Sequence, residues 1–380
     1  MGSFEFLTDF IDPIDKTAIA ENEIFTPHQI GYGIRTYEKN IPDLEDVDII
    51  IIGCAENRGA DPAIAHDTTP DVIRQSFYAL YHWHSNVTIA DLGNIKQGRT
   101  LADSYAALTA VIKELLPLNK KIIILGGSHD LTLPQYQAYA ALQQIIEVAC
   151  IDACIDIEQD ATTKHHSFLL DMLTVEPNYI KHYNHLAFQS YFVHPHLLET
   201  IDKLRLDCYR LGKVKEHMED MEPVLRHTHL LSIDISAIQH SYAPANTLSP
   251  NGLTGEEMCT LMQYAGMSNM MSSIGIYGFR TDKDVHHLTS KQIAQMLWYY
   301  MDGMIRGKLE TNLEHREDFN EFHVAFAEVE AHFLQSKRTG RWWMQLPNTT
   351  YIPCSYYDYL KASQNGIPER WLRAQERGSF

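Results

Sequence analysis

Four side chains of metal-binding type follow short apolar runs in this sequence. His129 comes after a run and a Gly-Gly pair, Asp152 and Asp156 follow a second run, and Asp234 ends a third. Apolar runs of this length are typical of buried strands, and an open α/β sheet binds its ligands beyond the carboxyl ends of the strands. Imidazole and carboxylate groups suit a divalent ion such as Mn²⁺. The pattern therefore predicts a metal site at one edge of a parallel sheet.

Each of these residues also has a simpler interpretation. Asp and Ser at the end of a strand often cap the next helix or close a turn, and for any one aspartate that role is the more common. Four ligands after three separate strands are a far more specific pattern than a lone His. Taken together, they favour a site.

The elements that would position this site can be read from hydrophobic periodicity. Strands are expected at 46–53, 86–93, 121–125, 145–151, 184–189, 207–211, 228–233 and 271–277, and helices at 70–81, 105–118, 132–142, 214–227, 254–266 and 289–307. Alternation of short apolar strands with longer helices predicts a three-layer α/β/α fold with a largely parallel sheet. We expect an N-terminal extension (1–44), an α/β domain (45–307) and a C-terminal extension (308–380) packed on or beside it.

Composition narrows the class of protein. The net charge of −18 argues against nucleic acid as a partner, because binding to phosphates needs a basic face. The six cysteines form no CxxC pair, which indicates reduced thiols and a cytoplasmic location. The N-terminus does not read as a secretory signal, and no apolar run reaches the roughly 18 residues of a membrane span.

Three motifs carry a resemblance to a known family. They are Gly-Gly-Ser-His-Asp at 126–130, Asp-Ala-Cys-Ile-Asp at 152–156, and Ser-Ile-Asp-Ile-Ser at 232–236 with Ala-Pro at 243–244; Gly-Leu-Thr-Gly-Glu-Glu follows at 252–257. Over residues 45–305 the chain resembles the ureohydrolase superfamily of arginase, agmatinase and formimidoylglutamase. The resemblance implies an arginase-like fold. It also implies two Mn²⁺ ions that activate a hydroxide for attack on a guanidinium or formimino carbon.

The same resemblance implies that one metal position keeps all of its ligands, whereas the other has two of them replaced. The family's ligands for one ion are all present, as His129, Asp152, Asp156 and Asp234. The two further ligands of the other ion are a His and an Asp in the family, and Cys154 and Ser236 stand in their places. A thiolate can bind Zn²⁺, but a Ser hydroxyl is a poor replacement for a carboxylate.

Residues at the family's substrate-binding positions also differ in this sequence. Gly278 stands where the family carries a Glu that pairs with the cationic group, and nearby Arg280 adds positive charge. His165 and His166 lie in the loop after the second motif. They are either a solvated pair or the source of a substitute metal ligand. Cys154 acting as a nucleophile is a weaker alternative, since no Cys-His-Asn framework is evident.

These departures predict a superfamily member that has lost dinuclear manganese C–N hydrolysis and acts as a pseudoenzyme in binding or assembly. The alternative is a formimidoylglutamase-like hydrolase of a linear amidine with a reduced, single-metal site. A third possibility is a mononuclear-metal or thiol-based activity on another substrate. For the metal content, the sequence is compatible with one bound Mn²⁺ or Zn²⁺ and also with no metal. The resemblance also implies a homo-oligomer or a protein partner.

Overall fold

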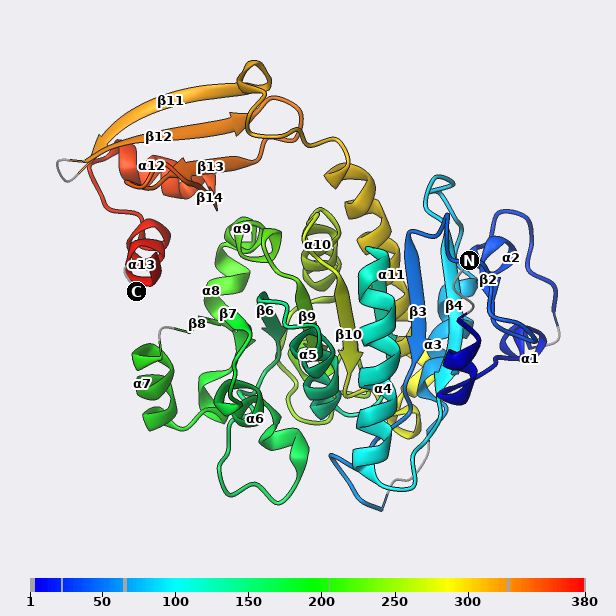
Figure 1. The fold of residues 1–380 in the computed structure, drawn as a ribbon. Coiled ribbons are helices and arrows are strands. Elements are labelled where there is room, and N and C mark those ends of the chain that lie inside the picture. Colours follow the sequence, from blue (N-terminus) through cyan, green and yellow to red (C-terminus); the bar gives the residue numbers. More distant parts are fainter. Residues whose placement is uncertain (1–3, 22, 64–66, 205, 327–328, 379–380) are drawn as a thin grey trace.

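The computed structural model describes residues 4–21, 23–63, 67–204, 206–326 and 329–378. At its centre is a ten-stranded sheet (Figure 1). The strand order is β1 (Ile11–Asp12), β4 (Ile89–Ile95), β3 (Ile49–Gly53), β5 (Lys121–Leu125), β10 (Ser273–Tyr277), β9 (Leu230–Asp234), β6 (Ile146–Ile151), β7 (Ile180–Phe188) and β8 (Asp207–Arg210), with β2 (Arg35–Thr36) beside β4. The pairing of β1 with β4 is antiparallel and the other pairings in this sheet are parallel.

Helices cover both faces of the sheet. One face carries α3 (Thr69–Tyr78), α8 (Leu211–Glu216), α9 (Met221–Arg226), α10 (Gly255–Gly266) and α11 (Leu288–Gly307), with the short α1 (Lys16–Ile19) and α2 (Ile30–Gly33); the other carries α4 (Leu101–Leu115), α5 (Thr132–Ala141), α6 (Phe168–Thr174) and α7 (Pro195–Lys203). Successive strand residues alternate between the two cores: Ile49 and Ile51 face the first, and Ile50 and Ile52 the second. Alternate side chains of a strand point to opposite faces. The expected three-layer α/β/α fold is thereby confirmed.

Two expected helices differ most from their predicted bounds. The helix expected at 105–118 begins earlier, at Leu101, because Thr100 and Asp103 form a capping box that starts it. The helix expected at 214–227 is broken into α8 and α9 by a 3₁₀ turn at Met218–Asp220. Pro223 accounts for the break, since a proline is tolerated in the first turn of α9 but would clash with a helix continuing from before it.

The residues after α11 form a second, antiparallel sheet of β11 (Phe319–Phe326), β12 (Val329–Ser336), β13 (Trp342–Gln345) and β14 (Tyr351–Cys354), followed by α12 (Tyr356–Ser363) and α13 (Glu369–Gly378). It lies at the amino-terminal ends of the main strands (Figure 1). Arg226, before β9, donates to the Trp342 carbonyl at 2.9 Å, and Arg341 donates to the Met267 carbonyl, before β10, at 2.7 Å. This second sheet is therefore at the opposite edge from the predicted metal site.

Membrane insertion by a helix finds no support in the fold. Within the described ranges, no helix has both the length and the apolar character that crossing a bilayer requires.

Candidate metal centre

The four predicted ligands meet at the carboxyl edge of the central strands. Strands β5, β10, β9 and β6 are neighbours in the sheet, so the segments that follow β5, β6 and β9 emerge side by side. His129 reaches the edge after a tight turn at Gly126 and Gly127, whose φ angles of +86° and +79° favour glycine. The sequence prediction that these residues converge agrees with the geometry.

Three carboxylates converge on one nitrogen of His129. Its Nδ1 lies 3.1 Å from Asp152 Oδ2, 3.1 Å from Asp156 Oδ2 and 3.9 Å from Asp234 Oδ2. Ligands about 2.1 Å from an octahedral ion are roughly 3.0 Å from their neighbours and roughly 4.2 Å from the ligand opposite. The three distances from Nδ1 to the carboxylate oxygens lie in the range expected between ligands of one divalent ion.

The other nitrogen of His129 is held by a serine. His129 Nε2 lies 2.9 Å from Ser232 Oγ, which also contacts the Thr132 hydroxyl. A proton on Nε2 that is donated to Ser232 leaves the Nδ1 lone pair directed at the carboxylates, which is the arrangement that a metal-binding histidine needs. Cys150 approaches the same Nε2 at 3.7 Å.

A second grouping of ligand-type atoms competes with this one. His129, Cys150 and Asp152 have such atoms within 4.8 Å of one another. The Cys150 sulfur, however, approaches the nitrogen that faces away from the carboxylates. We favour the carboxylate side, because all of its donors face a single point. Sequence analysis had treated Cys150 as an ordinary reduced thiol.

Ser236 lies on the side of the site on which the family's second ion would bind. Its hydroxyl donates to Asp152 Oδ1, the carboxylate oxygen turned away from His129, and the Cys154 backbone N–H donates to the same oxygen at 3.1 Å. The Ser236 backbone N–H donates to Asp234 Oδ1 at 2.7 Å. The outer oxygens of both carboxylates are thus engaged by protein donors rather than free to bridge two ions.

Cys154 is a poor nucleophile in this setting. Burial, and after it the charges of Asp152, Asp156 and Asp234, raise the pKa of the Cys154 thiol above its ordinary value. The thiolate is the reactive form, so the raised pKa works against thiol chemistry.

Gly278 lies against the metal ligands. Its φ is +76°, and a Cβ at this position would stand 2.3 Å from Asp234 Oδ2. Its backbone N–H donates to the Gly127 carbonyl at 2.9 Å, which ties the end of β10 to the turn before His129. Arg280, two residues on, forms a bidentate pair with Asp282 at 3.0 Å through both contacts, and Lys283 contacts the same carboxylate at 3.4 Å.

The two loop histidines have different surroundings. His166 contacts a proposed metal ligand, and His165 packs against His166. His166 Nδ1 lies 3.6 Å from Asp156 Oδ1, and this contact raises the pKa of His166. His165 stacks on His166 with ring centres 3.6 Å apart, and burial lowers the pKa of its imidazole to about 4. Among the described residues, its buried Nδ1 has no hydrogen-bond partner. A ligand role for either residue stays a prediction.

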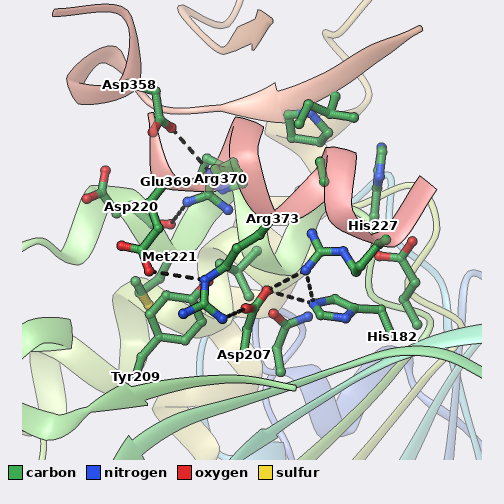
Figure 2. Close-up of a pocket in the computed structure, with 18 of the residues that line it drawn as sticks. His182, Asp207, Tyr209, Asp220, Met221, His227, Asp358, Glu369, Arg370 and Arg373 are labelled. Carbon is green, nitrogen blue, oxygen red and sulfur yellow. Dashed lines mark hydrogen bonds and ion pairs between the residues drawn. The ribbon is translucent and has the colours of Figure 1, made fainter. Parts of the chain in front are cut away.

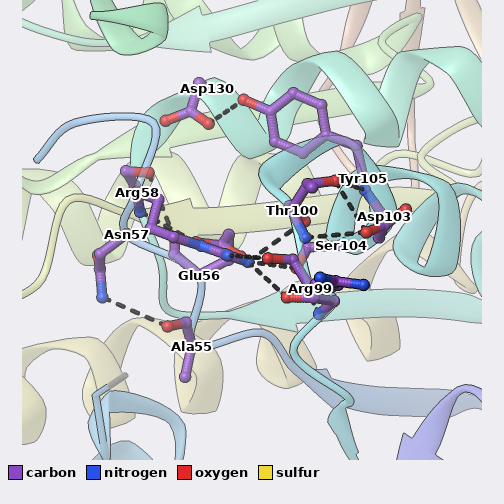
Figure 3. A network of polar contacts seen from close by, with 12 residues as sticks. Ala55, Glu56, Asn57, Arg58, Arg99, Thr100, Asp103, Ser104, Tyr105 and Asp130 are labelled. Carbon is purple, nitrogen blue, oxygen red and sulfur yellow. Dashed lines mark hydrogen bonds and ion pairs between the residues drawn. The ribbon is translucent and has the colours of Figure 1, made fainter. Parts of the chain in front are cut away.

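A polar network that sequence analysis missed supports the turn before His129 (Figure 3). Arg58 binds the buried Glu56 through Nε at 2.9 Å, and it also donates to the Gly98 carbonyl at 2.9 Å. The Glu56 carbonyl accepts the Ser128 N–H at 2.9 Å. Tyr105 donates to Asp130, the residue directly after His129. The signal for this network was weak, since Glu56 and Arg58 are only two residues apart and belong to none of the three motifs.

The charges at the centre favour a bound cation. Burial raises the pKa of the Asp234 carboxyl to about 7, and the charge of Asp152 adds to that effect. Burial opposes protonation of His129, but Cys150 and the hydrogen bonds of Asp152 and Asp156 outweigh it and raise the pKa of its imidazole well above the usual range. Three crowded carboxylates exceed what one imidazolium can balance, and a divalent ion held by these four residues would offset two of their three negative charges. The donor set therefore fits the metal.

Comparisons with known proteins point the same way. The model of the Arginase family matches residues 47–302, more than half of the chain. Formimidoylglutamase from Staphylococcus aureus (strain JH9) is 22% identical over 262 residues, covering 66% of this chain and 82% of that protein.

Solved structures share the fold. Formimidoylglutamase from Bacillus subtilis subsp. subtilis str. 168 has a TM-score of 0.65 at 18% identity and covers 74% of this chain and 95% of its own. Trypanosoma cruzi formiminoglutamase with Mn²⁺ has a TM-score of 0.62 at 16% identity, with coverages of 69% and 95%. At such identities, these structures establish the architecture alone.

Proposed function

Because this chain belongs to the arginase family, we propose that it hydrolyses a C–N bond of a linear amidine, as a formimidoylglutamase-like enzyme with one bound Mn²⁺. The observation that carries the proposal is the approach of three carboxylates to His129 Nδ1, at 3.1, 3.1 and 3.9 Å. The Staphylococcus aureus relative is named a formimidoylglutamase, which favours a formimino substrate over a guanidino one.

The choice of one ion over two follows from Ser236. In a dinuclear site, carboxylates such as those of Asp152 and Asp234 would be shared between the two ions. Here the outer oxygen of Asp152 accepts from the Ser236 hydroxyl, and that of Asp234 accepts from the Ser236 N–H. Cys154 adds no carboxylate or imidazole in compensation. The hard, mostly oxygen donor set supports Mn²⁺ in preference to Zn²⁺.

The chain's own residues then have distinct tasks. His129, Asp152, Asp156 and Asp234 would hold the ion, and Ser232 would fix the tautomer of His129. A bound divalent ion lowers the pKa of a coordinated water. It also polarises the substrate group attached to the electrophilic carbon. His166, half-exposed and beside Asp156, is the titratable group through which a proton would exchange with solvent.

The competing proposal is a protein that retains the fold and has lost catalysis. The changes at Cys154, Ser236 and Gly278 favour it, because a working site would need the substrate's cation to be paired by another anion. Asp67 is one candidate that sequence analysis did not find. Its carboxylate accepts from the Thr281 hydroxyl at 2.7 Å, in the loop that follows Gly278.

An activity assay separates the two proposals. The protein would be purified with Mn²⁺ and incubated with formimidoylglutamate, arginine and agmatine, with release of formamide or urea as the readout. We expect Mn²⁺-dependent hydrolysis of the formimino compound, its loss in Asp234→Asn, and its retention in Asp171→Asn, which alters a surface carboxylate paired with Lys164. Release no greater than that of Asp234→Asn would favour loss of catalysis.

A further inference from the structure

The second sheet and the central sheet enclose a cavity that the proposed hydrolysis does not use. Its volume is about 730 Å³, within the range of small-molecule sites. It is lined by residues of β7, β8, α8 and α9 and by residues of β14, α12 and α13 (Figure 2). The cavity lies at the amino-terminal side of the strands, away from His129 and its carboxylates.

Charge distinguishes this cavity from the rest of the molecule. Six lysines and arginines and five aspartates and glutamates line it, in a chain whose net charge is −18. The wall is therefore slightly positive and carries both signs, while apolar side chains such as Met221 and Ile352 contribute the remainder. Such a wall suits a small ligand that itself carries both charges.

One end of the cavity offers donors for a carboxylate. Arg373 Nη1 and Arg377 Nη1 donate to the two oxygens of Asp207, at 2.7 and 2.8 Å, and Arg373 Nε donates to Glu369 at 3.1 Å. These bonds explain how α13 is held against β8. They leave the Nη2 group of each guanidinium for a ligand, and paired guanidinium groups bind carboxylates in fork geometry.

Another part of the wall offers an acceptor for an ammonium group. Asp220 Oδ1 is buried and has no hydrogen-bond partner among the described residues, although the Asp220 carbonyl accepts from Arg370. Burial raises the pKa of the Asp220 carboxyl; a hydrogen bond with Ser355 opposes this shift, and the charge of Asp358 adds to it. A buried carboxylate oxygen without a donor is unfavourable, and a cationic ligand group would relieve it.

We propose that this cavity binds a free amino acid or a close zwitterionic relative, with its carboxylate on Arg373 and Arg377 and its ammonium group on Asp220. The alternative, in which α13 is only fastened by its arginines, accounts for the Asp207 contacts but leaves the unpartnered Asp220 oxygen unexplained. The site is distinct from the metal centre, so it stands or falls independently of the proposed hydrolysis.

The test is a thermal-shift screen of the twenty standard L-amino acids, followed by calorimetry with the best of them. Its analogue without the ammonium group and its analogue without the carboxylate are the chemical controls. We expect the amino acid to bind and each analogue to bind at least roughly tenfold more weakly, because each loses one charge-assisted contact.

Variants locate the binding. Asp220→Asn and Arg377→Gln should each weaken it roughly tenfold or more, whereas Arg306→Gln, in an exposed pair on α11, should not. Asp220→Asn leaves the Asp207 contacts of α13 in place, so a loss there cannot be ascribed to a detached helix. Unchanged binding in Asp234→Asn would separate this cavity from the metal centre. The proposal is overturned by the absence of any amino-acid binding, by equal affinity for the analogue without the ammonium group, or by binding that neither variant affects.

Discussion

Replacing Gly278 with alanine tests how closely the end of β10 is fitted to the metal ligands. The backbone there has φ +76°, and a left-handed conformation costs a non-glycine residue about 1–2 kcal/mol. The added Cβ would also stand 2.3 Å from Asp234 Oδ2, so the carboxylate must move. Overpacking of this kind costs about 1–3 kcal/mol. We therefore expect Gly278→Ala to lower the free energy of unfolding by about 2–5 kcal/mol.

Gly340 provides the matched control. It has φ +74°, and a Cβ there would meet nothing within 4 Å. Gly340→Ala should therefore show the backbone cost of about 1–2 kcal/mol alone. Urea unfolding of both variants gives the difference, and calorimetry with Mn²⁺ shows whether Asp234 has been displaced. We expect weaker Mn²⁺ binding in Gly278→Ala and unchanged binding in Gly340→Ala. Equal stability losses together with equal Mn²⁺ affinities would refute the close fit between Gly278 and Asp234.

Three further outcomes follow from the contacts described. The double variant Cys154→His with Ser236→Asp should bind a second ion, because it supplies two ligands and removes the hydrogen bond of the Ser236 hydroxyl to Asp152 Oδ1; an unchanged metal content per chain in elemental analysis would contradict this expectation. Asp207→Asn should lower the free energy of unfolding by about 2–3 kcal/mol in urea titrations, since it removes the charge of a buried carboxylate that two partly exposed arginines share, whereas Asp171→Asn should cost less than about 1 kcal/mol. Burial opposes ionisation of Asp207, but His182, Arg377 and Arg373 outweigh it and hold the pKa of that carboxyl below its usual range. Its contribution to stability is therefore present above the unfolded pKa of about 4 and lost as the pH falls below it, so melting temperatures should drop less steeply with acid in Asp207→Asn than in the parent protein.

The ligands could be predicted from the sequence because each follows a buried strand within a recognisable motif. Apolar runs fix where parallel strands end, and parallel strands place their ends at one edge, so His129 and Asp234 had to be neighbours despite their separation in the chain. The three-layer arrangement followed from the same alternation of strands and helices. These are consequences of local pattern.

What could not be predicted depends on side-chain orientation. Ser236 was expected to be an absent ligand, but its hydroxyl and N–H also engage the oxygens that would bridge to a second ion. Gly278 was expected to be a lost anion, but its contact with Asp234 shows that no side chain fits there without displacing that carboxylate. The second sheet escaped prediction because β11 and β12 mix polar and apolar residues instead of forming the continuous apolar runs of the central strands.

The most direct test of the central claim is the number of Mn²⁺ ions bound per chain. Protein would be prepared with excess Mn²⁺, dialysed, and measured by elemental analysis alongside Asp234→Asn. The account predicts one ion per chain in the parent protein and less in the variant, because His129, Asp152, Asp156 and Asp234 form one complete donor set while Ser236 closes the second. Two ions per chain would contradict the single-metal site, and no bound ion would contradict the metal-dependent hydrolase itself.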